Sequence, residues 1–445
     1  MKYIYACLFV FVICNNALAE QKNVKSYKQS LNLIEEMITN NELDKAETTL
    51  RALKGTTNPQ EEIEKWFLLG QVYMAKSDFT TAIQIYRKIL DNQPGLSRVR
   101  LELARALFFN KQFQDSEKHF LFVRADSALP DEVRQKIDIF LALIRQQKNW
   151  AIDLSFGIVP DSNINISGKE SEECINTIFG VLCRPLETAK SGIGLHLTTE
   201  GSYYLRFTKR FGLKTTLGVS LLDFETSQFD NNLLYFATGP RYVFDKGEVS
   251  LQATSSLRWY GGEFYNYSYG VREDMSWQLF NNWVLNTGTS IQQLGYKKNY
   301  INDVLAGYSW NVYLKPRYFI NNKSFISAGI GFEQDNTQEK SYGSDNVSYS
   351  IDFFNEFFGG FALFSRIQLT TSNYHGENFF VVDQNIQQKT RKDLTWQFYN
   401  RIYNRKLSWH NLTPALSYTY TNRKSNVPNQ EFDKHRIELE IIRRF

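Results

Sequence analysis

Apolar and polar residues alternate along the last two thirds of the chain, and this alternation constrains the fold more than any other feature of the sequence. In the stretch 249–254, Val, Leu and Ala alternate with Ser, Gln and Thr, and the stretches 308–315 and 347–353 follow the same rule. Successive side chains of a β-strand point to opposite faces, so each stretch has one apolar and one polar face. The segments are long and carry aromatic residues towards their ends, which is typical of tilted strands that cross a membrane.

The pattern predicts fourteen strands. They are expected at about 151–159, 191–207, 210–223, 231–244, 248–259, 267–280, 282–295, 305–320, 322–334, 346–358, 360–373, 389–402, 406–420 and 431–445. Every second link is tight, as at Asn281–Asn282, Gly359–Gly360 and Asn404–Arg405, whereas 160–190 and 374–388 are among the long links. Bacterial outer-membrane barrels have short periplasmic turns and long external loops. We therefore expect residues 150–445 to form a fourteen-stranded antiparallel transmembrane β-barrel.

The start of the chain predicts export. Residues 1–19 read as a signal peptide, with Lys2, an apolar run and Ala17-Leu18-Ala19 before the expected cleavage site. No later stretch holds eighteen consecutive apolar residues, the length that a transmembrane helix needs. The expected location is the outer membrane of a Gram-negative bacterium, with residues 20–149 in the periplasm.

Residues 20–149 have helical periodicity instead, and they predict a tetratricopeptide-repeat solenoid. The signature consists of Trp66, Leu69, Gly70, Tyr73, Ala82, Tyr86 and Pro94, at the offsets of a 34-residue repeat. Small residues at 70 and 82 let two helices cross, and Pro94 ends the second helix. Another repeat is expected at about 97–128, an earlier one around 43–53, and a capping helix over 131–148. Such a solenoid forms a concave groove that binds peptide or protein segments, although a plain spacer is the alternative.

Two cysteines, Cys174 and Cys183, remain after the signal peptide, nine residues apart in a polar stretch. In an oxidising compartment this spacing predicts a disulfide. A metal site is the rival interpretation, but no histidine lies nearby. The sequence contains no HExxH, Gly-x-Ser-x-Gly or phosphate-binding glycine loop, and its five histidines are scattered. We therefore expect no enzyme activity, metal or cofactor.

The last strand has the form of a signal for the barrel assembly machinery. Ile437, Leu439, Ile441 and the terminal Phe445 share one face of the expected strand. The net charge of +4 and the pI of 8.6 give no reason to expect a nucleic-acid partner. Outer-membrane lipids are expected around a monomeric barrel.

A run directly after the first strand, Pro160-Asp161-Ser162-Asn163-Ile164-Asn165, resembles a motif of the surface lipoprotein assembly modulators (Slam). These are outer-membrane translocons of type XI secretion, in which periplasmic repeats precede a fourteen-stranded barrel. The resemblance covers essentially the whole mature chain and implies transport of surface lipoproteins, or of soluble haemophore-like or host-interaction proteins. It makes Pro160, Asp161, Ser162, Asn163 and Asn165 candidate client or loop residues. All are also ordinary turn residues.

Two other functions remain open at the level of the sequence. A polysaccharide-export porin is one, although those proteins have longer repeat arrays and sixteen strands. A surface adhesin or host-interaction factor is the other, in which loops such as 374–388, with Tyr374, Phe379 and Phe380, bind host surface molecules.

Overall fold

A computed structural model describes residues 27–443 of the protein. The expected signal peptide and Phe445 lie outside the described residues. The chain forms two compact units, divided between His119 and Phe120. The sequence places the domain boundary at 149–150, where secondary structure changes from helix to strand, whereas the compact unit that holds the strands begins at Phe120.

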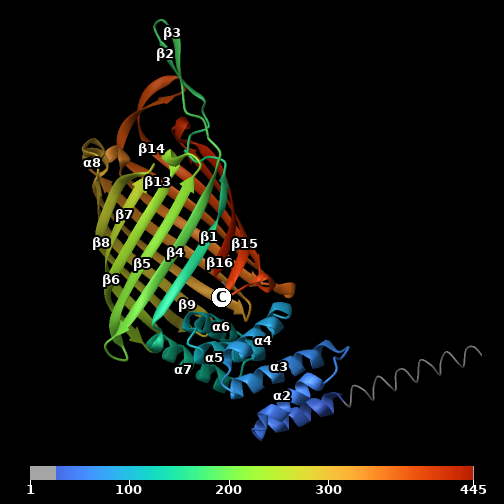
Figure 1. The fold of residues 1–445 in the computed structure, drawn as a ribbon. Coiled ribbons are helices and arrows are strands. Elements are labelled where there is room, and N and C mark those ends of the chain that lie inside the picture. Colours follow the sequence, from blue (N-terminus) through green and yellow to red (C-terminus); the bar gives the residue numbers. More distant parts are fainter. Residues whose placement is uncertain (1–26, 444–445) are drawn as a thin grey trace, which may run out of the picture. The chain divides into compact units, whose positions relative to one another are not determined.

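The first unit consists of paired helices (Figure 1). Residues 27–39 form a helix, followed by α2 (Leu43–Ala52), α3 (Pro59–Ala75), α4 (Phe79–Asn92), α5 (Ser97–Phe109) and α6 (Phe113–Arg124), which runs across the division. The α7 helix (Asp131–Gln147) belongs to the second unit. This order confirms the predicted helical repeats. No helix within residues 27–443 is long and apolar enough to cross a membrane.

The signature residues lie where α3 crosses α4. Tyr86 and Ala82 are fully buried, and a Cβ atom on Gly70 would lie 2.4 Å from the Tyr86 ring. One repeat further along the chain, Ala104 and Ser116 occupy the same positions, and the Ser116 hydroxyl donates to the Ala104 carbonyl at 2.8 Å. Small residues therefore set the approach of the two helices in both repeats.

We predict that Gly70→Ala destabilises the helical unit, because the added methyl group meets the immobile Tyr86 ring. Overpacking of this kind costs about 1–3 kcal/mol, more than the gain of up to about 1 kcal/mol in helix propensity. Thermal unfolding of the full-length protein, followed at 222 nm, should show a lower first transition. Gly55→Ala is the matched control, since nothing lies within 4 Å of its Cβ position. Equal transitions in the two variants would contradict the packing argument.

A polar cluster joins α2 to α3. The Glu47 carboxylate accepts hydrogen bonds from Tyr73 Oη at 2.6 Å, Lys76 Nζ at 2.8 Å and Arg51 Nε at 2.9 Å. The bonds from Lys76, Tyr73 and Arg51 lower the pKa of Glu47 from its ordinary value of 4.5 to about 2. Tyr73, a signature residue, therefore links one repeat to the next.

This cluster predicts a defined pH dependence. Because the folded-state pKa of Glu47 is depressed, its stabilisation is present above pH 4.5 and is lost as the pH falls towards 2. Glu47→Gln should lower the helical transition at pH 7 and flatten its dependence between those two pH values. Glu42→Gln is the control, since Glu42 pairs only with the exposed Lys45. Parallel pH profiles for wild type and Glu47→Gln would rule out the proposed linkage.

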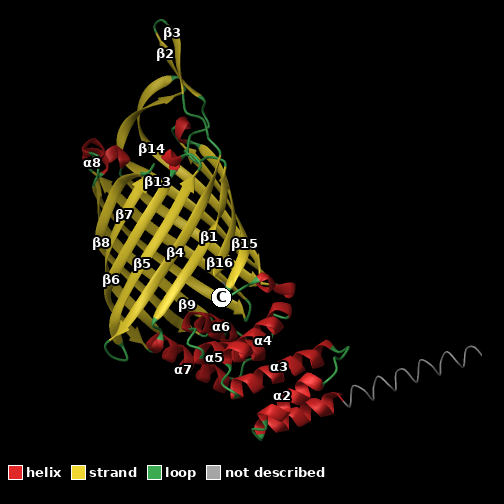
Figure 2. Ribbon diagram, in the orientation of Figure 1, coloured by secondary structure: helices red, strands yellow, loops and turns green. Residues whose placement is uncertain are grey.

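The second unit contains a closed antiparallel barrel (Figures 1 and 2). Within residues 27–443 its fourteen strands are β1 (Trp150–Asp161), β4 (Gly192–Arg206), β5 (Phe211–Phe224), β6 (Asn231–Phe244), β7 (Gly247–Tyr260), β8 (Glu263–Phe280), β9 (Trp283–Tyr296), β10 (Gly307–Asn321), β11 (Ser324–Thr337), β12 (Ser344–Glu356), β13 (Phe361–Val382), β14 (Asn385–Asn404), β15 (Leu412–Ser425) and β16 (Phe432–Arg443). Each strand pairs with its neighbour in sequence, and β1 pairs with both β4 and β16. The predicted strand number and antiparallel order are confirmed.

The two faces of the strands differ as the alternation predicts. On β1, Ile152, Phe156 and Ile158 are exposed on the outer face. Exposed aromatic residues gather at the end with the short turns; they include Trp150, Tyr203, Phe211, Tyr242, Trp277 and Trp283. An apolar outer band with an aromatic border matches the lipid-facing surface of a transmembrane barrel.

The expected long loop at 374–388 is wrong. Instead, β13 continues to Val382 and β14 starts at Asn385, so the two strands form a long hairpin. Asp383 and Gln384 make the turn with positive φ angles of 50° and 61°. A two-residue turn of this kind normally contains glycine or asparagine, and this one carries neither, so the sequence offered no turn signal.

The expected tight link at Asn404–Arg405 is also wrong. A 3-10 turn (Arg405–Leu407) follows β14, and β15 begins only at Leu412. His410 and Asn411 both have positive φ angles, which ends the extended conformation there.

Two long links contain regular structure of their own. Link 160–190 forms a separate two-stranded sheet, β2 (Glu172–Thr177) with β3 (Gly180–Pro185), and α8 (Asn299–Leu305) occupies the link after β9. The end of the barrel with these links is called the long-loop end below.

The end of α6 and α7 pack against the short-turn end of the barrel. Phe122 lies between inward-facing aromatic rings, with ring centroids 5.3 Å from Phe319 and 5.8 Å from Phe354. The buried Arg124 donates to the Phe280 carbonyl at 2.9 Å, and Arg145 of α7 donates to the Asp245 carbonyl at 2.8 Å. These contacts hold the helical segment on the turns of the barrel.

Candidate functional site

The helical unit carries a groove on its first helices. The groove has a volume of about 500 Å³. Its lining residues come from the helix 27–39, from α3 and α5, and from the start of α4; they are Glu35, Ile38, Thr39, Gln71, Met74, Ala75, Phe79, Glu102, Arg105 and Phe109. Gln71 and Arg105 stand one 34-residue repeat apart, as do Ala75 and Phe109, so successive repeats present equivalent positions to the groove.

The floor of this groove is apolar and aromatic. Phe79 and Phe109 stack with ring centroids 5.5 Å apart, and Phe109 is 43% exposed. Glu102 and Arg105 pair beside them at 2.9 Å. The surface therefore suits a segment with an apolar side chain and polar neighbours. The sequence analysis missed these residues, because the repeat signature marks the packed core and not the groove.

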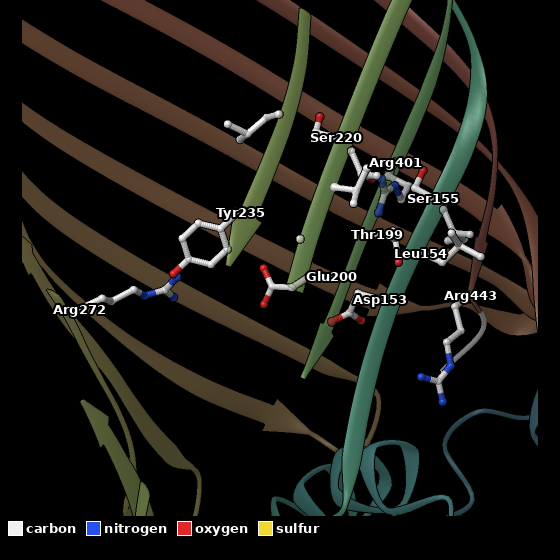
Figure 3. Close-up of a pocket in the computed structure, with 15 residues that line it drawn as sticks. Asp153, Leu154, Ser155, Thr199, Glu200, Ser220, Tyr235, Arg272, Arg401 and Arg443 are labelled. Carbon is white, nitrogen blue, oxygen red and sulfur yellow. The ribbon is translucent and has the colours of Figure 1, made fainter. Parts of the chain in front are cut away.

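The barrel lumen is polar and charged. A cavity of about 540 Å³ is lined by residues from several strands, among them Asp153 of β1, Glu200 of β4 and Arg272 of β8. These three side chains extend into the same space in Figure 3. Arg272 pairs with Asp274 at 2.8 Å, so part of the charge is balanced within the wall.

A second group of lumen charges lies where β1 meets the last strands. Glu440 is buried and accepts from Arg401 Nε at 2.9 Å and Arg401 Nη2 at 3.0 Å. Ser155 of β1 and Ser417 of β15 also donate to the Glu440 carboxylate. This group joins β1, β14, β15 and β16 on the inner face.

The candidate motif lies at the long-loop end of β1 and contacts the start of β16. Asp161 is 3% exposed and pairs with Lys434 Nζ at 2.8 Å. The Ser162 N–H donates to the His435 carbonyl at 2.9 Å, and the His435 N–H donates to the Ser162 hydroxyl at 2.8 Å. The sequence analysis did not single out Lys434 or His435 as partners, since they lie about 270 residues away.

The remaining motif residues order the loop itself. Asn163 is buried; its side chain donates to the Ser167 carbonyl and accepts from the Ser167 N–H, both at 2.9 Å. Asn165 bridges to the far side of the loop by donating to the Thr188 carbonyl at 2.9 Å. Pro160 is the second-last residue of β1. The structure therefore shows most of these polar side chains engaged within the protein.

The predicted disulfide is confirmed. Cys174 and Cys183 are register partners in the β2–β3 hairpin and are bonded to each other. Within residues 27–443, Glu172 and these two sulfur atoms are the group close enough to suggest a metal site. Bonded sulfurs are not thiolates, so they do not provide the ligands that zinc requires.

We predict that Cys174→Ser/Cys183→Ser loosens this hairpin without unfolding the barrel, because the hairpin is a separate sheet outside the barrel. A disulfide that closes a short loop stabilises by about 2–4 kcal/mol. Trypsin added to intact cells should cleave after the exposed Arg184 faster in the variant, while the barrel keeps its heat-modifiable mobility on a gel. Equal cleavage would mean that the contact of Asn176 with the Gln384 carbonyl holds the hairpin instead.

The closed barrel with an apolar exterior, preceded by helical repeats, defines an outer-membrane β-barrel protein. The chain belongs to the surface lipoprotein assembly modifier family. The family model "Surface lipoprotein assembly modifier" matches residues 150–445. The model "Surface lipoprotein assembly modifier, N-terminal TPR repeats" matches residues 17–120. These matches confirm the resemblance found in the sequence.

Curated relatives agree with this assignment. The chain is 23% identical to the surface lipoprotein assembly modifier of Pasteurella multocida, over 87% of this chain and 77% of the relative. It is 22% identical to surface lipoprotein assembly modifier 1 of Neisseria meningitidis, over 87% and 77%. It is 22% identical to the hemophilin secretion modulator of Acinetobacter baumannii, over 85% and 78%. The solved outer membrane channel DcaP of Acinetobacter baumannii has a TM-score of 0.38 and 7% identity, over 66% of this chain and 97% of that chain, and is too distant to inform function.

Proposed function

We propose that this protein is a translocon that moves specific client proteins from the periplasm to the cell surface. The clients are surface lipoproteins or soluble relatives, such as haemophore-like or host-interaction proteins. The helical repeats engage the client and the barrel is its conduit. The observation that carries this proposal is the presence, in one chain, of an aromatic groove and a polar barrel lumen.

The groove supplies the client-binding step. Aromatic rings at its floor bury apolar client side chains, and such anchors dominate the energy of protein interfaces. Glu35, Glu102 and Arg105 at its rim offer hydrogen bonds to the client backbone. The groove thus suits an unfolded or extended segment, which the periplasm presents before the client folds.

The barrel supplies the passage. Its lumen is lined by carboxylates, guanidinium groups and hydroxyls, which solvate a polypeptide as water does. The short-turn end carries the start of β1, so we place it at the periplasm, with the long-loop end outside. Folding of the client outside would give direction without a nucleotide. The proposal assigns no catalytic step, metal or cofactor to the chain.

The direct test is surface display of candidate lipoproteins in intact cells. Deletion of this protein should leave its client inaccessible to added protease at constant total client. Phe79→Ala/Phe109→Ala should reduce display, because losing an apolar anchor of about 1.4 kcal/mol weakens binding about tenfold. Display should return with the wild-type gene.

Leu33→Ala is the matched control for the groove. Leu33 is an exposed apolar residue of the helix 27–39 outside the groove lining, so its removal should leave display unchanged. Equal loss in the control and the groove variant would argue against client binding in the groove. If deletion of the protein changes no client's location, the translocon proposal fails.

A second function is favoured by one observation. Ile178 and Phe179, at the tip of the β2–β3 hairpin, are 93% and 94% exposed. An exposed apolar tip at the long-loop end suits a direct contact with a host surface molecule. Binding of whole cells to host surfaces, lost in Ile178→Ser/Phe179→Ser with client display intact, would support this function.

A further inference from the structure

The barrel closes where β1 meets β16, and this junction, called the seam below, is paired less completely than the other edge of the same strand. On the β4 edge, every residue of β1 from Trp150 to Asp161 has a register partner. On the β16 edge, within the described residues, partners are confined to residues 155–158 and Asp161. The ladder is therefore interrupted at Val159 and Pro160.

Pro160 removes a hydrogen bond from the seam and not from the β4 edge. The Ser162 N–H points to β16, where it donates to the His435 carbonyl, whereas the Asn149 carbonyl faces β4 and accepts from the Tyr204 N–H. Backbone groups of a strand face the same side at every second residue. Position 160 thus faces β16, and proline has no N–H to donate.

Gly157 is a second weak point on the same edge. A Cβ atom at this position would lie 2.4 Å from the Leu439 carbonyl oxygen and 2.8 Å from the Glu440 Cα atom. The seam therefore requires glycine here, and glycine in a strand interior loses conformational freedom on pairing. Its register partner, Glu440, is held instead by the side chains of Arg401 and Ser155.

At the long-loop end, side chains complete what the ladder lacks. We call this group the latch: Asp161, Ser162 and Asn163 on the β1 side, and Lys434 and His435 on β16. Its contacts are an ion pair and hydrogen bonds at the mouth of the barrel. Groups at that position can exchange these bonds for water, whereas backbone groups in hydrocarbon cannot.

From these observations we infer that the seam is a lateral opening, held shut by the latch, through which the acyl chains of a lipidated client leave the lumen for the outer leaflet. The inference rests on the proposed function and deepens it. Acyl chains are poorly accommodated beside Asp153, Glu200 and Arg401 in the lumen. The apolar outer face on both sides of the seam, with Ile158 and Leu439, leads directly into lipid.

The test is to lock the seam. Ile158 and Leu439 are register partners across it and both are exposed on the outer face. In Ile158→Cys/Leu439→Cys, a bis-maleimide should join β1 to β16, and the native disulfide does not react because it is oxidised. Ile351→Cys/Ile367→Cys is the matched control, since these residues are exposed register partners of β12 and β13. Heat-modifiable mobility before cross-linking shows that both variants fold.

The probes are the lipoprotein whose display depends on this protein in the experiment above, and its form without the lipid-bearing cysteine. Locking the seam should stop display of the lipidated form and leave export of the soluble form unchanged. The control cross-link should change neither. Display of the lipidated form through a locked seam overturns the inference, and so does equal arrest of both forms. Failure of the proposed function is distinct, because neither form would then depend on the protein before cross-linking.

A second variant tests the latch without a cross-link. Asp161→Asn keeps the shape of the side chain and removes its ion pair with Lys434. It should lower the temperature at which the folded band converts on a gel. Asp245→Asn, which removes an exposed ion pair with Arg210 at the opposite end, should not. Equal conversion temperatures would show that the latch does not hold the seam and would overturn the inference.

Discussion

Closure of the backbone hydrogen-bond ladder is the constraint on which the rest of this structure depends. In hydrocarbon an unpaired N–H or C=O group has no water to bind, so a sheet in a membrane must close on itself. The chain meets this requirement by bringing β16 back to β1. The closure sets the lumen that the other strands line, and it places the motif after β1 against the start of the last strand.

The two units of the protein meet their packing needs in different ways. In the helical unit, small residues such as Gly70 and Ala104 let helices of one repeat approach, and Glu47 links neighbouring repeats through side chains. In the barrel, pairing is between strands, and the side chains are free to serve the lipid on one face and the lumen on the other. Aromatic groove and polar lumen follow from these two arrangements, and together they suit capture and passage of a polypeptide.

Much of the fold could be predicted because its signals are local. Alternation along 249–254 identifies a strand whatever surrounds it, and the spacing from Trp66 to Pro94 identifies a repeat. The errors fall where the local signal is absent. The hairpin turn at Asp383–Gln384 has positive φ angles without glycine, and the late start of β15 depends on the conformations of His410 and Asn411. The groove was also missed, because Phe79 and Phe109 look like ordinary core residues until the repeats are stacked.

The sequence by itself determined the two kinds of structure, the strand number and their order, since periods of 3.6 and 2 are properties of short segments. Only the tertiary structure decided which distant residues meet. Asp161 finds Lys434, and Ser162 finds His435, because closure of the barrel sets the register between the first strand and the last. No local pattern encodes that register, and it turns a run of ordinary turn residues into contacts across the seam.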